Sequence, residues 1–190
     1  MILSDVDIEK ALGKGDLIID PRPKKEQIDS TTIDLHIGEP FYKWDPGLVN
    51  QPGVGLSINI DEYDFKKLAN SYLQEIKKDK AGAYIIEPNI FYLAPTYEKI
   101  GLPRESKLAA RVEGKSSLAR LGLVIHMTAP TIHSGYGPGI ITLEIYNYGP
   151  FRIIVTPGIS LICQVIIECV TSKPRKRYQR KFMKQKGPKG

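Results

Sequence analysis

Residues 139–147 read GIITLEIYN, and their alternation decides the class of fold that this chain can adopt. Apolar side chains at Ile141, Leu143 and Ile145 alternate with more polar ones. Successive side chains of a β-strand point to opposite faces, so the stretch predicts a strand with one face in a hydrophobic core. Glu144 falls on the other face and is held by a rigid element.

Glu144 allows two interpretations. If its face of the strand lines a cleft, desolvation raises the pKa of the carboxyl group toward neutrality, which suits a general base. On an open face, the same residue is a solvated glutamate or the partner of an arginine.

Short runs of β-branched and aromatic residues fill most of the chain on both sides of this strand. Pro130, Pro138 and Pro157 stand at run boundaries, where turns are needed. The pattern predicts a mainly β fold, a barrel or sandwich in one domain, with a few peripheral helices. The runs are TIDLHI, YIIE, FYLA, KLAARVE, LVIHMTA, FRIIVT and SLICQVIIECV.

Two segments carry a helical pattern. Ser4 and Asp7 form a capping-box variant that predicts a short helix at the start of the chain. A longer helix is expected from about residue 61 to residue 78, where apolar residues recur at helical spacing and Asn59 offers an N-cap.

The composition describes an ordinary globular protein. The chain has 190 residues, 42% of them hydrophobic and 25% charged, which is enough for one sizeable core and excludes wholesale disorder. No apolar run approaches the roughly 20 residues that a bilayer span requires. The first ten residues are acidic rather than basic, unlike a signal peptide. We therefore expect a cytoplasmic protein without a membrane partner.

The positive charge of the chain is concentrated at its end. Residues 171–190 hold nine Lys and Arg and no acid, so residues 1–170 carry slightly more acids than bases. Such a tail fits a contact with a polyanion, such as a phosphate group or nucleic acid, and it also fits a solvated segment.

The cysteines and histidines exclude several kinds of site. Cys163 and Cys169 fall on one face of a predicted strand, and we expect both to be buried by packing rather than joined in a disulfide. No closely spaced His and Cys set fits zinc, and the H-x-E…P-C-x-x-C pattern of the zinc deaminases is missing. Walker A, G-x-G-x-x-G and G-x-S-x-G motifs are missing as well.

The stretch VEGKSSLARLGL, residues 112–123, is the second one that suggests chemistry. Ser116 and Ser117 stand at the start of a predicted short helix, where free N–H groups and hydroxyls can receive phosphate oxygens. Lys115 supplies positive charge, and Arg120 falls one turn later on the same face. Serines also cap many helices that bind nothing, so this stretch alone is a weak signal.

Taken together, five stretches resemble the dCTP deaminase family, the deaminase branch of the dUTPase superfamily. The resemblance implies a distorted jelly-roll or β-barrel for residues 1–170, with a tail, residues 171–190, that closes over the active site. It also implies a homotrimer with active sites between subunits, and hydrolytic deamination of dCTP to dUTP and ammonia without zinc. The stretches are MILSDVDI, STTIDLHIG, VEGKSSLARLGL, GIITLEIYN and YQRKFMKQKGP.

The same resemblance implies roles for individual residues. Glu144 matches the catalytic glutamate, which activates a water to attack carbon 4 of the cytosine. Arg120 and Ser116 match residues that a neighbouring subunit places beside the reaction centre. Lys115, Ser116 and Ser117 match residues that hold phosphates.

Further matches concern the base and the triphosphate. Ala129 matches a position whose backbone contacts the base. Tyr178, Lys181 and Gln185 match tail residues that close over the triphosphate, with Mg²⁺ bridging its oxygens. The implied partner is dCTP, and whether dTTP inhibits stays open.

Three positions depart from the family pattern. His133 stands where much of the family and the dUTPases have an aspartate that handles the deoxyribose and the attacking water. It is either a substrate-binding residue or a hydrogen-bonded turn residue. His36 stands where an arginine is usual, and Phe182 replaces a tyrosine.

Two alternatives to a simple deaminase remain. The first is a bifunctional deaminase and dUTPase, or a dUTPase, that releases pyrophosphate. The missing aspartate at residue 133 argues against it. The second is a non-enzymatic module that binds nucleotides or nucleic acid through the tail. Nucleic acid is the less expected partner, because aromatic residues for stacking bases are seen only in the tail.

Overall fold

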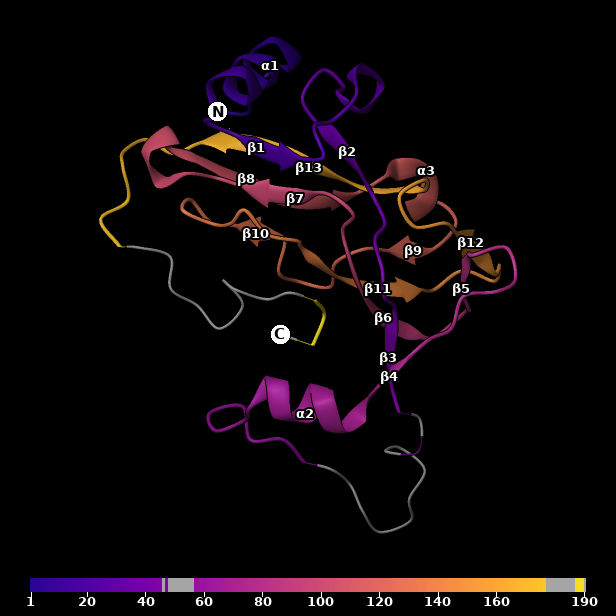
Figure 1. The fold of residues 1–190 in the computed structure, drawn as a ribbon. Helices are drawn as coiled ribbons and strands as arrows, with labels where there is room; N and C mark the ends of the chain where they lie inside the picture. Colours follow the sequence, from indigo (N-terminus) through magenta and orange to yellow (C-terminus); the bar gives the residue numbers. More distant parts are fainter. Residues whose placement is uncertain (46, 48–56, 177–186, 190) are drawn as a thin grey trace.

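A computed structural model describes residues 1–45, 47, 57–176 and 187–189 of the chain, and this part is mainly β with three α-helices (Figure 1). The helices are α1 (Asp5–Lys14), α2 (Phe65–Tyr72) and α3 (Ser116–Ala119), with 3₁₀ turns η1 (Lys25–Gln27) and η3 (Arg104–Ser106). The strands are β1 (Ile18–Asp20), β2 (Ile33–His36), β3 (Tyr42–Trp44), β4 (Leu73–Glu75), β5 (Tyr84–Ile86), β6 (Phe91–Pro95), β7 (Lys99–Gly101), β8 (Leu108–Gly114), β9 (Leu123–Val124), β10 (Thr131–Ile132), β11 (Thr142–Asn147), β12 (Ile153–Val155) and β13 (Leu161–Cys169).

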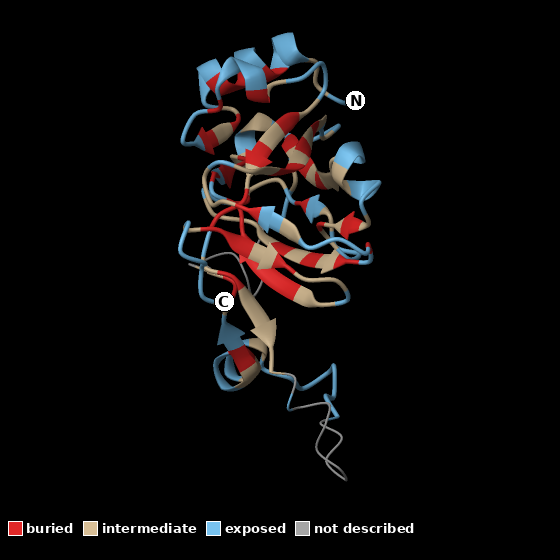
Figure 2. Cartoon of the chain, turned by 90° about the vertical axis from the view of Figure 1, so that its right-hand side faces the viewer, coloured by how far each residue is buried: buried red, intermediate tan, exposed pale blue. Residues whose placement is uncertain are grey.

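The strands form two larger antiparallel sheets and two small ones. One sheet has the order β10-β8-β13-β2 and the other the order β4-β3-β6-β11-β9, while β1 pairs with β7 and β12 with β5. Both larger sheets contribute to a single hydrophobic core, with Leu35 and Val165 from the first and Ala94 and Ile145 from the second. Figure 2 shows buried residues, in red, concentrated in the strands. The predicted mainly β, jelly-roll-like fold is confirmed, although the sheets do not close into a barrel.

The strand predicted from GIITLEIYN is β11, a central strand of the second sheet. Leu143 and Ile145 are fully buried, whereas Glu144 is only partly buried on the opposite face. The strand pairs with β6, where Glu144 lies opposite Leu93, and with β9 at its other edge. Neighbours on both sides therefore fix the direction of the Glu144 side chain.

The first predicted helix is confirmed as α1. Ser4 is its N-cap, and its side chain accepts a hydrogen bond from the Asp7 amide. Gly15 ends the helix in the left-handed conformation, at φ 76°, which glycine adopts without steric cost.

The second predicted helix is shorter than expected, and its cap was assigned to the wrong residue. Helix α2 begins after Asp64, which accepts a hydrogen bond from the Lys67 amide, and not at Asn59. It ends at Tyr72, because residues 73–75 pair with β3 as strand β4, with Leu73 opposite Trp44. Inter-strand hydrogen bonds thus replace the last predicted turns of helix, a long-range effect that helical spacing cannot reveal.

The expectation that both cysteines are buried is right for Cys163 and wrong for Cys169, which is exposed. Cys163, Val165 and Ile167 do share the core face of β13, as the alternation predicts. Cys169 is the last residue of that strand and lies beyond the edge of the core.

Candidate active site

Glu144 is the centre of the candidate site. One carboxylate oxygen, Oε2, accepts a hydrogen bond of 3.4 Å from the amide of Met127. Met127 belongs to the segment that follows β9, the strand paired with β11. Strand pairing sets the face from which the carboxylate projects, and this amide gives it one hydrogen-bond partner.

The surroundings of Glu144 change its acidity. Burial raises its pKa, because a desolvated carboxyl group favours the neutral form. The Met127 amide and the charge of His126 act in the opposite direction and lower the pKa, but burial has the largest effect. A glutamate of raised pKa, still partly open to solvent, is suited to accept a proton from water.

Two buried polar atoms near this carboxylate have no hydrogen-bond partner within the described part of the chain. They are His126 Nδ1 and Thr142 Oγ1. Thr142 stands two residues before Glu144 and therefore on the same face of β11. Buried polar atoms are nearly always paired in native proteins, so this face has polar capacity for a bound molecule.

Helix α3 carries the residues predicted to contact phosphates. It spans only four residues, and its N-cap is Lys115 rather than a serine, without a side-chain capping bond. Ser116, Ser117 and Arg120 are exposed. The ammonium group of Lys115 is not free, because it forms an ion pair with Asp34 on β2.

The contacts around Glu144 within residues 57–176 do not include Arg120 or Ser116. Helix α3 nevertheless lies next to β9, at the edge of the sheet that holds β11 (Figure 1). The fold of one chain thus leaves these two residues exposed near the edge of the sheet that carries the carboxylate.

Two of the remaining predicted site residues lie on the surface, and three lie outside the described part of the chain. Ala129 is exposed in the segment between β9 and β10, and His133 is exposed just after β10. The His133 carbonyl accepts a hydrogen bond of 3.1 Å from the Tyr136 amide, which shows that a turn begins there. Tyr178, Lys181 and Gln185 lie outside the described residues.

Sequence reasoning missed His126 and Glu113. The ring nitrogen Nε2 of His126 lies 3.7 Å from Glu113 Oε2 on β8. The polar face of the run LVIHMTA and its closeness to GIITLEIYN were available signals. However, only the pairing of β9 with β11 brings residue 126 to Glu144.

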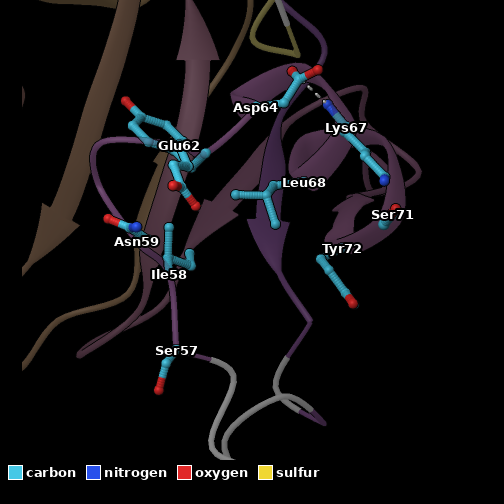
Figure 3. Close-up of a pocket in the computed structure, with 10 residues that line it drawn as sticks. Ser57, Ile58, Asn59, Glu62, Asp64, Lys67, Leu68, Ser71 and Tyr72 are labelled. Carbon is cyan, nitrogen blue, oxygen red and sulfur yellow. Dashed lines mark hydrogen bonds between the residues drawn. The ribbon is translucent and has the colours of Figure 1, made fainter.

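A cavity of about 440 Å³ lies elsewhere, along α2 and the segment before it (Figure 3). Its walls include none of the residues predicted for the site. They are Ser57, Ile58, Asn59, Glu62, Tyr63, Asp64, Lys67, Leu68, Ser71 and Tyr72.

Metal-binding clusters and membrane-spanning helices are both absent from the described residues. None of these residues form a group of three or more His, Cys, Asp or Glu able to hold a metal ion. No helix in the same part of the chain is long and apolar enough to cross a bilayer.

Fold and site together define a β-sandwich protein with a partly desolvated carboxylate on a central strand, an arrangement suited to proton transfer. Comparison with known sequences gives the family. A profile described as dCTP deaminase-like matches residues 2–170, and the chain belongs to this family.

Individual relatives agree with this assignment. A protein of Methanosphaera stadtmanae named "dCTP deaminase, dUMP-forming" is 38% identical over 98% of this chain and 91% of its own length. A Rhodospirillum rubrum protein named "dCTP deaminase" is 35% identical over 94% of this chain and 87% of its own.

A solved structure also resembles the chain. The 2'-deoxycytidine 5'-triphosphate deaminase of Agrobacterium tumefaciens superposes with a TM-score of 0.64 at 26% identity. The match covers 88% of this chain but only 48% of that one, so this chain spans about half its length.

Proposed function

We propose that the protein deaminates dCTP hydrolytically to dUTP and ammonia, with Glu144 as the general base. The observation that carries the proposal is the partly buried Glu144 carboxylate, whose pKa burial raises, on an interior strand of a chain that belongs to the dCTP deaminase-like family. The names of relatives at 35% and 38% identity support the same substrate.

In the proposed reaction, Glu144 takes a proton from a water molecule whose oxygen attacks carbon 4 of the cytosine. The proton then passes to the amino group, the carbon–nitrogen bond breaks, and ammonia leaves as the carbonyl of dUTP forms. Water and dCTP are thus converted to dUTP and ammonia. We assign no step to zinc.

Arg120 and Ser116 are proposed to act from a neighbouring subunit of a homotrimer. A guanidinium group beside the reaction centre orients the water and stabilises developing charge. The exposure of both residues in the single chain supports this sharing.

The remaining residues are proposed to bind the substrate, which enters as its Mg²⁺ complex. Lys115, Ser116 and Ser117 hold phosphates, so Lys115 must exchange its contact with Asp34 for a phosphate or share it. Ala129 contacts the base through its backbone, and His133 lies at the deoxyribose. The tail, residues 171–190, closes over the triphosphate through Tyr178, Lys181 and Gln185. We propose a cytoplasmic location.

A second candidate is a bifunctional enzyme that continues to dUMP and pyrophosphate. Relatives in Methanosphaera stadtmanae and Methanobrevibacter smithii, 38% and 35% identical, carry the words "dUMP-forming" in their names. Against it stands His133, which replaces the aspartate that handles the attacking water in dUTPases.

Chromatography of the products formed from dCTP and Mg²⁺ by the purified protein separates the candidates. We expect dUTP and ammonia in equal amounts, without pyrophosphate. Formation of dUMP and pyrophosphate instead would establish the bifunctional enzyme.

If dCTP is left unchanged, the deaminase proposal fails and a binding module becomes the better description. Whatever that outcome, deletion of residues 172–190 compares the two descriptions directly. An enzyme loses turnover and stays trimeric, whereas a module that binds polyanions loses a salt-sensitive affinity.

A further inference from the structure

His126 lies between two carboxylates that come from different strands. Strand β9 pairs with β11 through Val124 and Tyr146, and His126 follows two residues after this pair, close enough for its charge to favour the ionised form of Glu144. On its other side, His126 Nε2 lies 3.7 Å from Glu113 Oε2. The ring is thus the link between β8 and the proposed general base.

Glu113 has a carboxylate oxygen available for this contact. Arg111, on the same face of β8, places Nη2 3.1 Å from Glu168 Oε1 but Nη1 3.7 Å from Glu113 Oε1. The arginine is therefore closer to Glu168, and Oε2 of Glu113 faces the histidine.

Glu113 makes an ion-pair contact with the ring of His126, at a distance longer than a hydrogen bond. The second ring nitrogen, Nδ1, is buried without a partner among the described residues. The attraction between Glu113 and the ring is therefore one of the interactions that can set the orientation of the ring.

The peptide bond after His126 connects the ring to Glu144. Met127 N–H, which donates to Glu144 Oε2, lies in the same rigid peptide plane as the His126 carbonyl. A displacement of the His126 backbone therefore moves this amide relative to the Glu144 carboxylate.

We propose that Glu113 is a positioning residue that acts through His126 to hold the Met127 amide, and with it Glu144, in the geometry for proton transfer. The inference rests on the proposed deaminase function, and it assigns Glu113 a role that acts through His126. The charged groups facing His126 are Glu113 from β8 and Glu144 from β11.

The test compares E113Q with a matched control, E168Q. Both glutamate side chains are 34% exposed, both lie on the same sheet, and both pair with Arg111, but only Glu113 faces His126. E113Q should lower kcat for dCTP deamination by about 10–100-fold, the usual cost of a small misplacement, with KM nearly unchanged. E168Q should keep kcat within about twofold of the wild type. Equal losses in the two variants would overturn the proposal.

A pH profile of H126Q provides a second readout, which a merely structural role would not change. Glutamine keeps hydrogen-bonding capacity but carries no charge, so the favourable effect of His126 on the Glu144 carboxylate is lost. The acidic limb of kcat/KM should move to higher pH in H126Q. An unmoved limb would contradict the link between His126 and Glu144.

A third readout does not need activity and keeps the two proposals distinguishable. Amide hydrogen exchange at Met127 should become faster in E113Q than in the wild type and stay unchanged in E168Q. If dCTP is not deaminated but Met127 responds in this way, the proposed function fails while the positioning contact stands. Unchanged exchange in E113Q would overturn the positioning contact itself.

Discussion

His36 and Glu98 form a closed histidine–carboxylate pair, whereas His126 and Glu144 form an open one. In the closed pair, Glu98 is 1% exposed and accepts hydrogen bonds from Gln27 Nε2 at 3.1 Å and the His36 amide at 2.9 Å, with His36 Nδ1 at 2.6 Å. In the open pair, Glu144 is partly buried and has one long hydrogen bond, from Met127 at 3.4 Å.

The difference lies in how much hydrogen-bonding capacity is already used. Gln27 also donates to the Asp34 carbonyl, so the closed pair fastens η1 to β2 and is filled by the protein itself. Near the open pair, His126 Nδ1 and Thr142 Oγ1 remain without partners within the described residues. A saturated buried cluster stabilises the fold, whereas an unsaturated one has capacity to bind and react with a ligand.

The largest expected effect is a loss of activity when the open pair is changed. E144Q should reduce deamination by about 10³-fold, within the range for removal of a general base. Its thermal stability should not fall, since burial raises the pKa of Glu144 and the ionised carboxylate therefore opposes folding at neutral pH. Steady-state kinetics and a melting curve of the same preparation measure both quantities. Retained activity in E144Q would refute the role of Glu144.

The next effect should appear in the closed pair as a loss of stability. E98A leaves Gln27 and His36 without their buried acceptor and should cost about 3 kcal/mol, or roughly 10 °C in melting temperature. The activity of the protein that remains folded should be near that of the wild type. A thiol reagent gives a local check, because buried Cys163 is expected to react only when this region opens.

The reaction of the exposed Cys169 serves as the control in that labelling experiment. It should be labelled in the wild type and in E98A at similar rates, while labelling of Cys163 becomes faster only in E98A. If E98A melts like the wild type, the closed pair is not the stabilising cluster described above.

The smallest expected effect is a displacement of the pH profile. Burial raises the pKa of Glu144 above the ordinary value of 4.5, so the base becomes protonated, and kcat/KM falls, at a pH above that value. The free energy of unfolding changes in the opposite sense. It falls as the pH rises from the ordinary pKa of Glu144 to the raised one, because the carboxyl group ionises in the unfolded chain over this range but stays protonated in the folded one. A limb of kcat/KM at or below 4.5 would contradict a pKa of Glu144 raised by burial.

Local sequence patterns predicted those features that depend on neighbouring residues in the chain. The alternation around Glu144 gave strand β11 and its two faces, and Ser4 gave the cap of α1. Patterns failed where distant segments decide the outcome. Residues 73–75 form a strand rather than the predicted helix because they pair with β3. Cys169 is exposed because it lies beyond the edge of the core.

The candidate site also combines residues that local motifs identify with contacts that only distant segments make. Motifs identified Glu144, Arg120, Ser116 and Lys115, but the ion pair that holds Lys115 involves Asp34, which is 81 residues away in the chain. His126 was missed because its relation to Glu144 arises from the register of two strands.

The sequence by itself determined the mainly β class, the family and the candidate base, because periodicity and motifs are properties of adjacent residues. The tertiary structure alone decided how far Glu144 is desolvated, which amide faces it, and which histidine stands beside it. Burial and hydrogen bonding depend on segments that meet only when the sheets form, and no local pattern contains that information.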